Sequence, residues 1–98
     1  MKIKFIDRCI IIMLASQKIH GYSLYREFKD AGFEISMGNF YKKLKKLENM
    51  GLVSSRWEMV NGRARKVYYL TEEGEKKLKS CMENLEKFLF KIKGSIPF

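Results

Sequence analysis

The sequence predicts one mainly α-helical domain of the α+β class, in which three helices are followed by a two-stranded β-hairpin and a last helix. Three observations lead to this prediction. Apolar residues recur at helical spacing in four segments, an Asn-Gly dipeptide separates two β-prone runs, and glycines stand where helices should end. The 98 residues suffice for one domain with a modest core.

The first two helices are expected at about Phe5–Gln17 and Gly21–Ala31. The first is apolar nearly all round, which is typical of a helix that is buried on more than one side and hints at contact with a second chain. The second has Gly32 after it as a natural stop. Its apolar positions are Tyr22, Leu24, Tyr25 and Phe28.

The third helix, expected between the cap Ser36 and Gly51, is the most informative. At about 100° per residue, one stripe of it is apolar and the opposite face is basic. The apolar stripe is Phe40, Leu44 and Leu47. The opposite face holds Lys42, Lys45 and Asn49 with Asn39 and Lys46 beside them, and Tyr41 and Lys43 lie on the two shoulders.

The hairpin is expected from Leu52–Val60 and Arg63–Leu70, because Asn-Gly between two such runs favours a type I′ turn. Its tip is basic, with Arg63, Arg65 and Lys66. Glu58 should face Arg65 across the strands and form a surface ion pair worth at most about 1 kcal/mol.

Two further aromatic or polar residues are assigned structural roles. Trp57 is expected to pack on the hairpin, with the cover of a ligand pocket as the alternative. His20 stands just before Gly21 at a helix start, where a structural residue is favoured over a catalytic or metal-binding one.

The last helix opens at Thr71, a good cap, and the acidic residues after it suit the positive end of the helix dipole. Its apolar stripe has to be buried, and we expect it to contact the first helix and the equivalent helices of a second chain. The residues of this stripe are Leu78, Met82, Leu85, Phe88, Leu89 and Ile92.

The charge distribution points to a polyanionic partner. Residues 36–70 hold eight basic and two acidic residues, so this third of the chain carries +6 of the net +9. Cys9 and Cys81 form no CxxC motif, and one histidine cannot complete a zinc site with them. We expect reduced thiols in a cytoplasmic protein, with a disulfide within the chain or between two chains as the alternative. The apolar run 9–15 is too short for a membrane span. No nucleophile–base pair, phosphate-binding loop or metal cluster predicts an enzyme, a cofactor or a metal.

Three helices and a basic hairpin describe a winged helix-turn-helix protein that binds double-stranded DNA. Helix 36–50 would enter the major groove, with its lysines on phosphates and Asn39, Tyr41 and Lys42 near base edges. Wing 58–66 would follow the backbone or the minor groove. Tyr41 could instead be a packing residue and Asn39 a first-turn hydrogen bonder. The competing functions are a protein-interaction module and a non-specific architectural DNA binder.

Several stretches of the chain resemble the PadR family of transcriptional regulators. They are IIIML at 10–14, HGYSL at 20–24, GNFYKKLKKLE at 38–48 with GLV at 51–53, and GRARKVYYLT at 62–71 with Gly74. They fall in the family's order and cover about residues 9–78. No single stretch is decisive, but together they are specific.

The resemblance implies a homodimer, built largely through the last helix, that represses transcription by reading a pseudo-palindrome with two wings and two third helices. Residues 1–71 would be the DNA-binding domain, and residues 72–98 the dimerisation helix of the same compact unit. Family members often sense small aromatic or drug-like molecules near the dimer interface, which makes a small aromatic effector a candidate partner. With one short C-terminal helix, the chain is similar to the smaller type within the family, which leaves open whether it has an effector pocket.

Overall fold

A computed structural model describes residues 4–15 and 17–93 of the chain. The predicted α+β class is confirmed, and most predicted boundaries agree with the observed ones within one or two residues. In chain order the elements are α1 (Phe5–Met13), β1 (Ile19–His20), α2 (Gly21–Asp30), α3 (Met37–Asn49), β2 (Val53–Val60), β3 (Arg63–Leu70) and α4 (Glu72–Lys93). Residues 1–3 and 94–98, at the ends of the two predicted units, lie outside the described residues.

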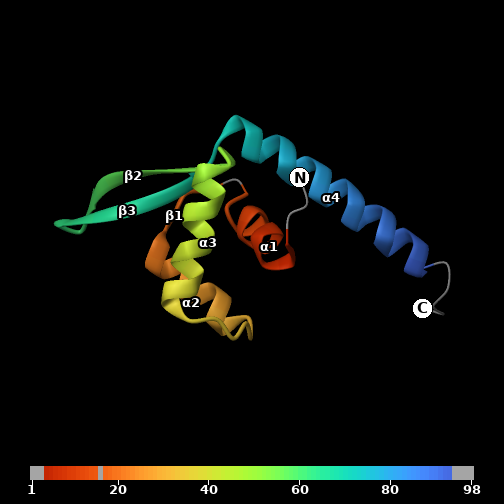
Figure 1. Ribbon diagram of the computed structural model, residues 1–98, viewed down its shortest axis with the longest axis horizontal. Coiled ribbons are helices and arrows are strands. Elements are labelled where there is room, and N and C mark those ends of the chain that lie inside the picture. Colours follow the sequence, from red (N-terminus) through yellow and green to blue (C-terminus); the bar gives the residue numbers. More distant parts are fainter. Residues whose placement is uncertain (1–3, 16, 94–98) are drawn as a thin grey trace.

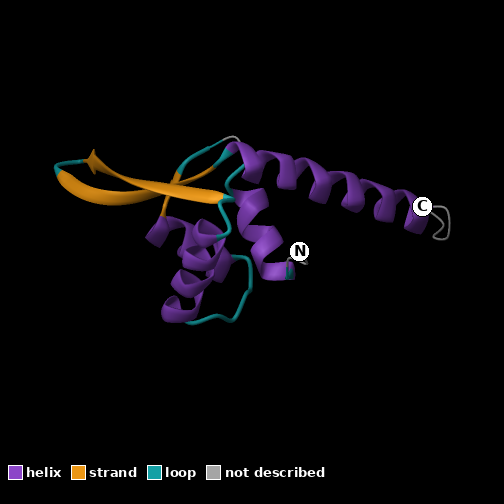
Figure 2. Cartoon of the chain, turned by 45° about the horizontal axis from the view of Figure 1, so that its top comes forward, coloured by secondary structure: helices purple, strands orange, loops and turns teal. Residues whose placement is uncertain are grey.

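Two long elements project in opposite directions from a small helical body (Figure 1). The body consists of α1, α2 and α3, the β2–β3 hairpin extends from one side of it, and α4 extends from the other (Figure 2). The principal-axis extents of 52 × 28 × 23 Å describe this elongated shape. Neither α4 nor any other helix in the described part of the chain has the length and apolar character needed to cross a lipid bilayer.

The core lies where the three helices of the body meet the base of the hairpin. Its side chains come from the apolar stripes that the periodicity predicts. The fully buried members are Ile10, Ile11, Leu14, Leu24, Phe28, Phe40, Leu44 and Leu47, and Val53, Val67 and Tyr68 of the hairpin are almost completely buried. The rings of Phe28 and Phe40 lie 5.1 Å apart between centroids, so aromatic contacts join α2 to α3.

The sheet has three strands in the order β1-β3-β2, whereas the sequence predicts two. The missed strand, Ile19–His20, pairs antiparallel with Tyr68 and Val67 of β3. A strand of two residues has no alternation that a pattern could reveal, and it exists because β3 offers it a free edge. The first helix also ends earlier than predicted, at Met13 and not Gln17, because the chain turns at residues 14–15 to reach this edge.

The hairpin turn has the predicted geometry. Asn61 has φ 52° and Gly62 has φ 78°, so both central residues have the positive φ that a type I′ turn requires. Glu58 stands opposite Arg65 in the register, as predicted. The predicted ion pair between them is wrong, since the Glu58 carboxylate accepts from Arg56 Nε at 2.6 Å and from Lys18 Nζ at 3.0 Å. Lys18 lies directly before β1, the strand that the sequence did not reveal.

The junction between the hairpin and α4 is tightly built. The Thr71 hydroxyl accepts the Gly74 N–H at 3.0 Å, which confirms Thr71 as the helix cap, and donates to the Gly51 carbonyl at 2.6 Å. Gly74 is buried against the backbone carbonyl of Leu52, and a Cβ atom at this position would clash with that carbonyl oxygen. The contact fixes where α4 leaves the body.

Candidate nucleic-acid interface

The fold presents the basic face of α3 to solvent. Ser36 caps the helix, since its hydroxyl oxygen accepts the Asn39 N–H at 3.2 Å, and Gly51 follows its end with φ 77°. The buried stripe holds α3 against the rest of the body, so the opposite face of the helix has to be exposed. Lys42 and Lys45 are exposed there, as is the Asn39 side chain.

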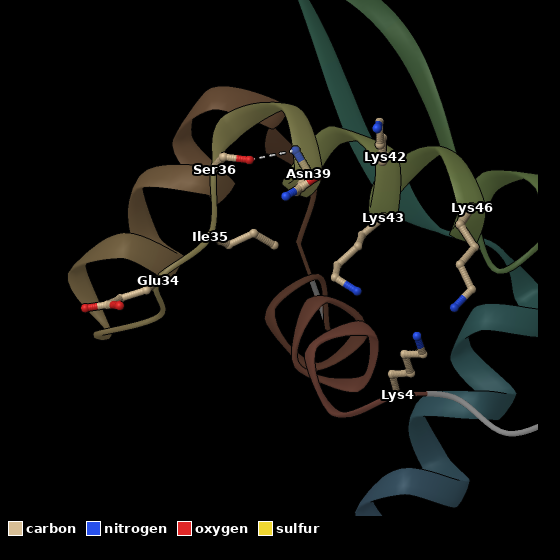
Figure 3. A pocket seen from close by; sticks show the side chains of 8 residues that line it. All are labelled: Lys4, Glu34, Ile35, Ser36, Asn39, Lys42, Lys43 and Lys46. Atoms are coloured by element: carbon tan, nitrogen blue, oxygen red, sulfur yellow. Dashed lines mark hydrogen bonds between the residues drawn. The ribbon is translucent and has the colours of Figure 1, made fainter.

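A hollow of about 470 Å³ lies beside the N-terminal half of α3 (Figure 3). Lys43 and Lys46 point into it from α3 toward Lys4 at the start of α1, whereas Lys42 points away from them (Figure 3). Lys4 adds a cation that the sequence analysis did not assign to the site. Four lysines around one hollow, with Glu34 as the only acidic residue among the described residues of its lining, create a surface that attracts anions.

Lys46 also has a structural partner. Its Nζ lies 3.0 Å from Asp7 Oδ2, and the Asp7 side chain is almost completely buried while that of Lys46 is 44% exposed. The other carboxylate oxygen of Asp7, Oδ1, has no hydrogen-bond partner among the residues that the structure describes. Lys46 therefore balances a buried charge and links α3 to α1.

The wing carries the predicted basic residues at its tip. Arg63 and Lys66 are exposed and Arg65 is half-buried. Lys66 Nζ lies 5.7 Å from the centroid of the Tyr68 ring, a cation–π distance that orients the ammonium over the hairpin face. On the opposite face, Arg56 makes a similar contact at 5.3 Å with Tyr69.

A groove of about 390 Å³ separates the wing from the helices. Its aromatic lining consists of Tyr22, Tyr41, Trp57 and Tyr68, and its basic lining of His20, Arg65 and Lys66. None of the described residues that line it is acidic. Sequence reasoning missed the parts played by His20 and Tyr22, because only the pairing of β1 with β3 places the start of α2 beside the wing.

The floor of this groove depends on Gly21. A Cβ atom there would lie 2.9 Å from the Tyr68 ring and 3.0 Å from the Tyr41 hydroxyl, so only glycine lets both rings pack on the first turn of α2. Burial raises the pKa of Tyr41, and the neighbouring Tyr22 raises it further. Burial, with Glu48 and Tyr41 nearby, raises the pKa of Tyr68 to about 12. Both phenols therefore stay protonated at neutral pH and can donate hydrogen bonds.

Trp57 does not pack as the sequence predicts. Its side chain is 70% exposed, and Met59, two residues along the same strand, is 71% exposed. The two share a face of β2 because side chains alternate along a strand. The register places Trp57 opposite Lys66 and Met59 opposite Ala64, and both of these β3 residues line the groove.

The apolar stripe of α4 is largely uncovered. Leu85, Phe88 and Leu89 are 42%, 58% and 54% exposed, and Met82 is 46% exposed. Leu78 and Ile92 are half-buried. A pocket of about 240 Å³ runs between α1 and α4, with Phe5 and Ile12 on one side and Leu85 and Phe88 on the other. Within the described residues, this stripe has too few partners to be covered by its own chain.

Comparison with known proteins identifies the family. Residues 10–80 match the transcriptional regulator PadR-like family. A transcriptional regulator of Mycobacterium tuberculosis is 35% identical over 80 residues, which are 82% of this chain and 75% of the relative.

Solved structures share the fold. A PadR family transcription regulator of Clostridium difficile has a TM-score of 0.78 at 26% identity, and the match covers 94% of this chain and 97% of that one. Bacillus subtilis PadR, solved in complex with operator DNA, has a TM-score of 0.70 at 22% identity, over 83% of this chain and 48% of that one.

Proposed function

Because this chain belongs to the PadR-like family of transcriptional regulators and is not an enzyme, we propose that it is a homodimeric repressor that binds a specific double-stranded DNA sequence. The observation that carries the proposal is the groove of about 390 Å³ between the wing and the helices. Tyr41 of α3 and the basic residues Arg65 and Lys66 of the wing line the same groove, so the side of α3 that carries Tyr41 faces the basic wing.

Each of the two basic elements suits a different part of the duplex. The 13 residues of α3 make a rod about 20 Å long, which fits the major groove. Its exposed lysines would contact phosphates, and Asn39, Tyr41 and Lys42 would lie closest to base edges. Arg63 at the tip of the wing would follow the backbone or enter a narrow minor groove. The DNA-binding residues that we propose are Asn39, Tyr41, Lys42, Lys43, Lys45, Lys46, Arg63, Arg65 and Lys66.

The uncovered stripe of α4 supports dimerisation. A second copy of the chain would bury the exposed apolar residues of α4, together with Phe5 and Ile12 of α1. Two-fold symmetry would then place two copies of α3 on half-sites about one helical turn, or about 10 bp, apart. Residues 1–71 serve as the DNA-binding unit and residues 72–98 as the dimerisation unit. A small aromatic effector would bind in the pocket between α1 and α4.

Selection of bound duplexes from a random pool at about 0.15 M salt tests the proposal. Enrichment of an inverted repeat is the expected result, and placing that repeat at a promoter should make transcription fall when the chain is expressed. If duplexes were retained without enrichment of any sequence, the protein would be a non-specific architectural DNA binder. If no duplex were retained, the protein-interaction module would become the better interpretation.

Salt dependence locates the contacts. Lys42→Ala should reduce the slope of log K against log salt concentration by about one unit, because one phosphate contact is lost. Lys79→Ala, an exposed lysine on α4, is the matched control and should leave the slope unchanged. Equal slopes for the two variants would remove Lys42 from the interface.

A further inference from the structure

We infer that the groove between the wing and the start of α2 holds one sugar-phosphate strand of the DNA duplex, with Trp57 as its apolar wall. The inference rests on the proposed function and adds a contact surface to it. The strand in question is the backbone that separates the major groove occupied by α3 from the minor groove beside the wing. If α3 and the wing bind adjacent grooves, this backbone has to pass between them.

The chemistry of the groove suits a phosphodiester chain. Its cationic lining, which includes no acidic side chain among the described residues, favours an anion. The phenols of Tyr41 and Tyr68 are protonated at neutral pH, and the Tyr22 hydroxyl accepts a hydrogen bond of 3.4 Å from Arg26 Nη1. Phenolic and ammonium donors around an open channel can bind phosphate oxygens that follow one another along a strand.

Among the described residues, Trp57 has little cover. Its side chain is 70% exposed on a hairpin face, and it is not one of the side chains that form the core or pack against it. Its position opposite Lys66 places an apolar ring next to a cation. A sugar-phosphate strand presents the same alternation, since deoxyribose carbons lie between charged phosphates. We therefore assign the ring to the sugars and Lys66 to a phosphate.

The chain offers a direct probe, because Trp57 is its only tryptophan. The wild-type protein is titrated with a mixed-sequence 20-bp duplex at low salt, and tryptophan emission and its quenching by acrylamide, a neutral quencher, are recorded. Bound DNA should change the emission and reduce the quenching constant at least twofold. Unchanged quenching on a saturated complex would overturn the inference.

Substitutions separate this contact from a general effect of the wing. Trp57→Ala should weaken binding of specific and mixed-sequence duplexes by the same factor, about three- to tenfold, and Trp57→Phe should restore most of it. Met59→Ala is the matched control, since Met59 is equally exposed on the same face but lies outside the groove lining. Met59→Ala should change the affinity for DNA less than twofold. If it lost as much affinity as Trp57→Ala, the exposed apolar side chains of the wing would contact DNA without a specific role for the groove.

The two proposals fail in different ways. A wild-type protein that binds no duplex contradicts the proposed function itself. Another set of results contradicts only the groove assignment. In it, the wild-type protein binds duplexes with unchanged quenching of Trp57, Lys42→Ala weakens binding, and Trp57→Ala does not. Circular dichroism of each variant shows that lost binding does not come from lost folding.

Discussion

In the body of the molecule, the apolar stripe of α3 is completely buried, whereas the corresponding stripe of α4 is about half-exposed. Both helices have apolar residues at three- and four-residue spacing and charged residues opposite. The stripe of α3 contacts α2 and the hairpin of the same chain, while α4 extends beyond the body and leaves the outer part of its stripe uncovered (Figure 1). Periodicity thus predicts which face of a helix will be buried, but not which partner will bury it.

The largest expected effect comes from a charge on the exposed stripe of α4. Leu85→Glu should convert the proposed dimer to monomers, because burying an unpaired carboxylate costs about 3 kcal/mol or more. Analytical ultracentrifugation at micromolar concentration measures this change. Ser80→Glu adds the same charge on the opposite face of α4 and should leave the dimer intact. If the Leu85→Glu variant sedimented as a dimer, the interface would have to lie elsewhere.

The joint between body and α4 should be the next most sensitive position. Gly74→Ala places a methyl group against the Leu52 carbonyl, which cannot move without disturbing the hairpin. We expect a loss of about 2 kcal/mol in the free energy of unfolding, or about 10 °C in Tm. Gly38→Ala is the matched control because a Cβ atom there has open space around it. It should stabilise α3 by up to about 1 kcal/mol, since glycine disfavours helix interiors. Equal Tm changes would show that the joint is pliable.

Within the body, a third experiment compares two lysines of the same basic face. Lys46→Ala leaves the buried Asp7 carboxylate without its partner and should cost about 1–3 kcal/mol in urea unfolding. Lys42→Ala removes an exposed cation and should change stability by less than about 0.5 kcal/mol. In the double variant with Asp7→Asn, the cost of Lys46→Ala should largely disappear. A cost that persisted in this double variant would mean that the ion pair does not stabilise the body.

The smallest expected effect is a pH dependence of the hairpin base. The pKa of Tyr68 is raised to about 12 in the folded chain, above its ordinary value of 10. Between pH 10 and about pH 12, Tyr68 therefore keeps its proton in the folded chain and loses it in the unfolded chain. This contribution to stability is full below pH 10 and is lost as the pH rises toward 12. Tyr68→Phe should reduce the loss of stability between pH 9 and pH 11 by about 1 kcal/mol, measured by urea unfolding.

Tyr69→Phe serves as the control for this measurement, because it removes a hydroxyl from the adjacent, half-buried residue of β3. If both variants behaved like the wild type, groups other than Tyr68 would govern the alkaline limit.

Much of the candidate site follows from local chemistry. The stripe of α3 sets its basic face, the Asn-Gly pair sets the turn, and Thr71 sets the start of α4. Each of these depends on residues close together in the chain, so spacing and residue type suffice to predict it. The family resemblance rests on the same local stretches, and the comparison with known proteins agrees with it.

Other features depend on contacts between residues far apart in the chain. β1 exists only because β3 has an edge to pair with, and that pairing brings His20 and Tyr22 to the groove. Lys46 pairs with Asp7 across 39 positions, and Glu58 takes Lys18 as a partner in place of Arg65. The sequence by itself determined the helices, the hairpin turn and the basic faces, since these depend on backbone preference and periodicity. Only the tertiary structure decided which side chains meet, because such meetings depend on how the elements pack.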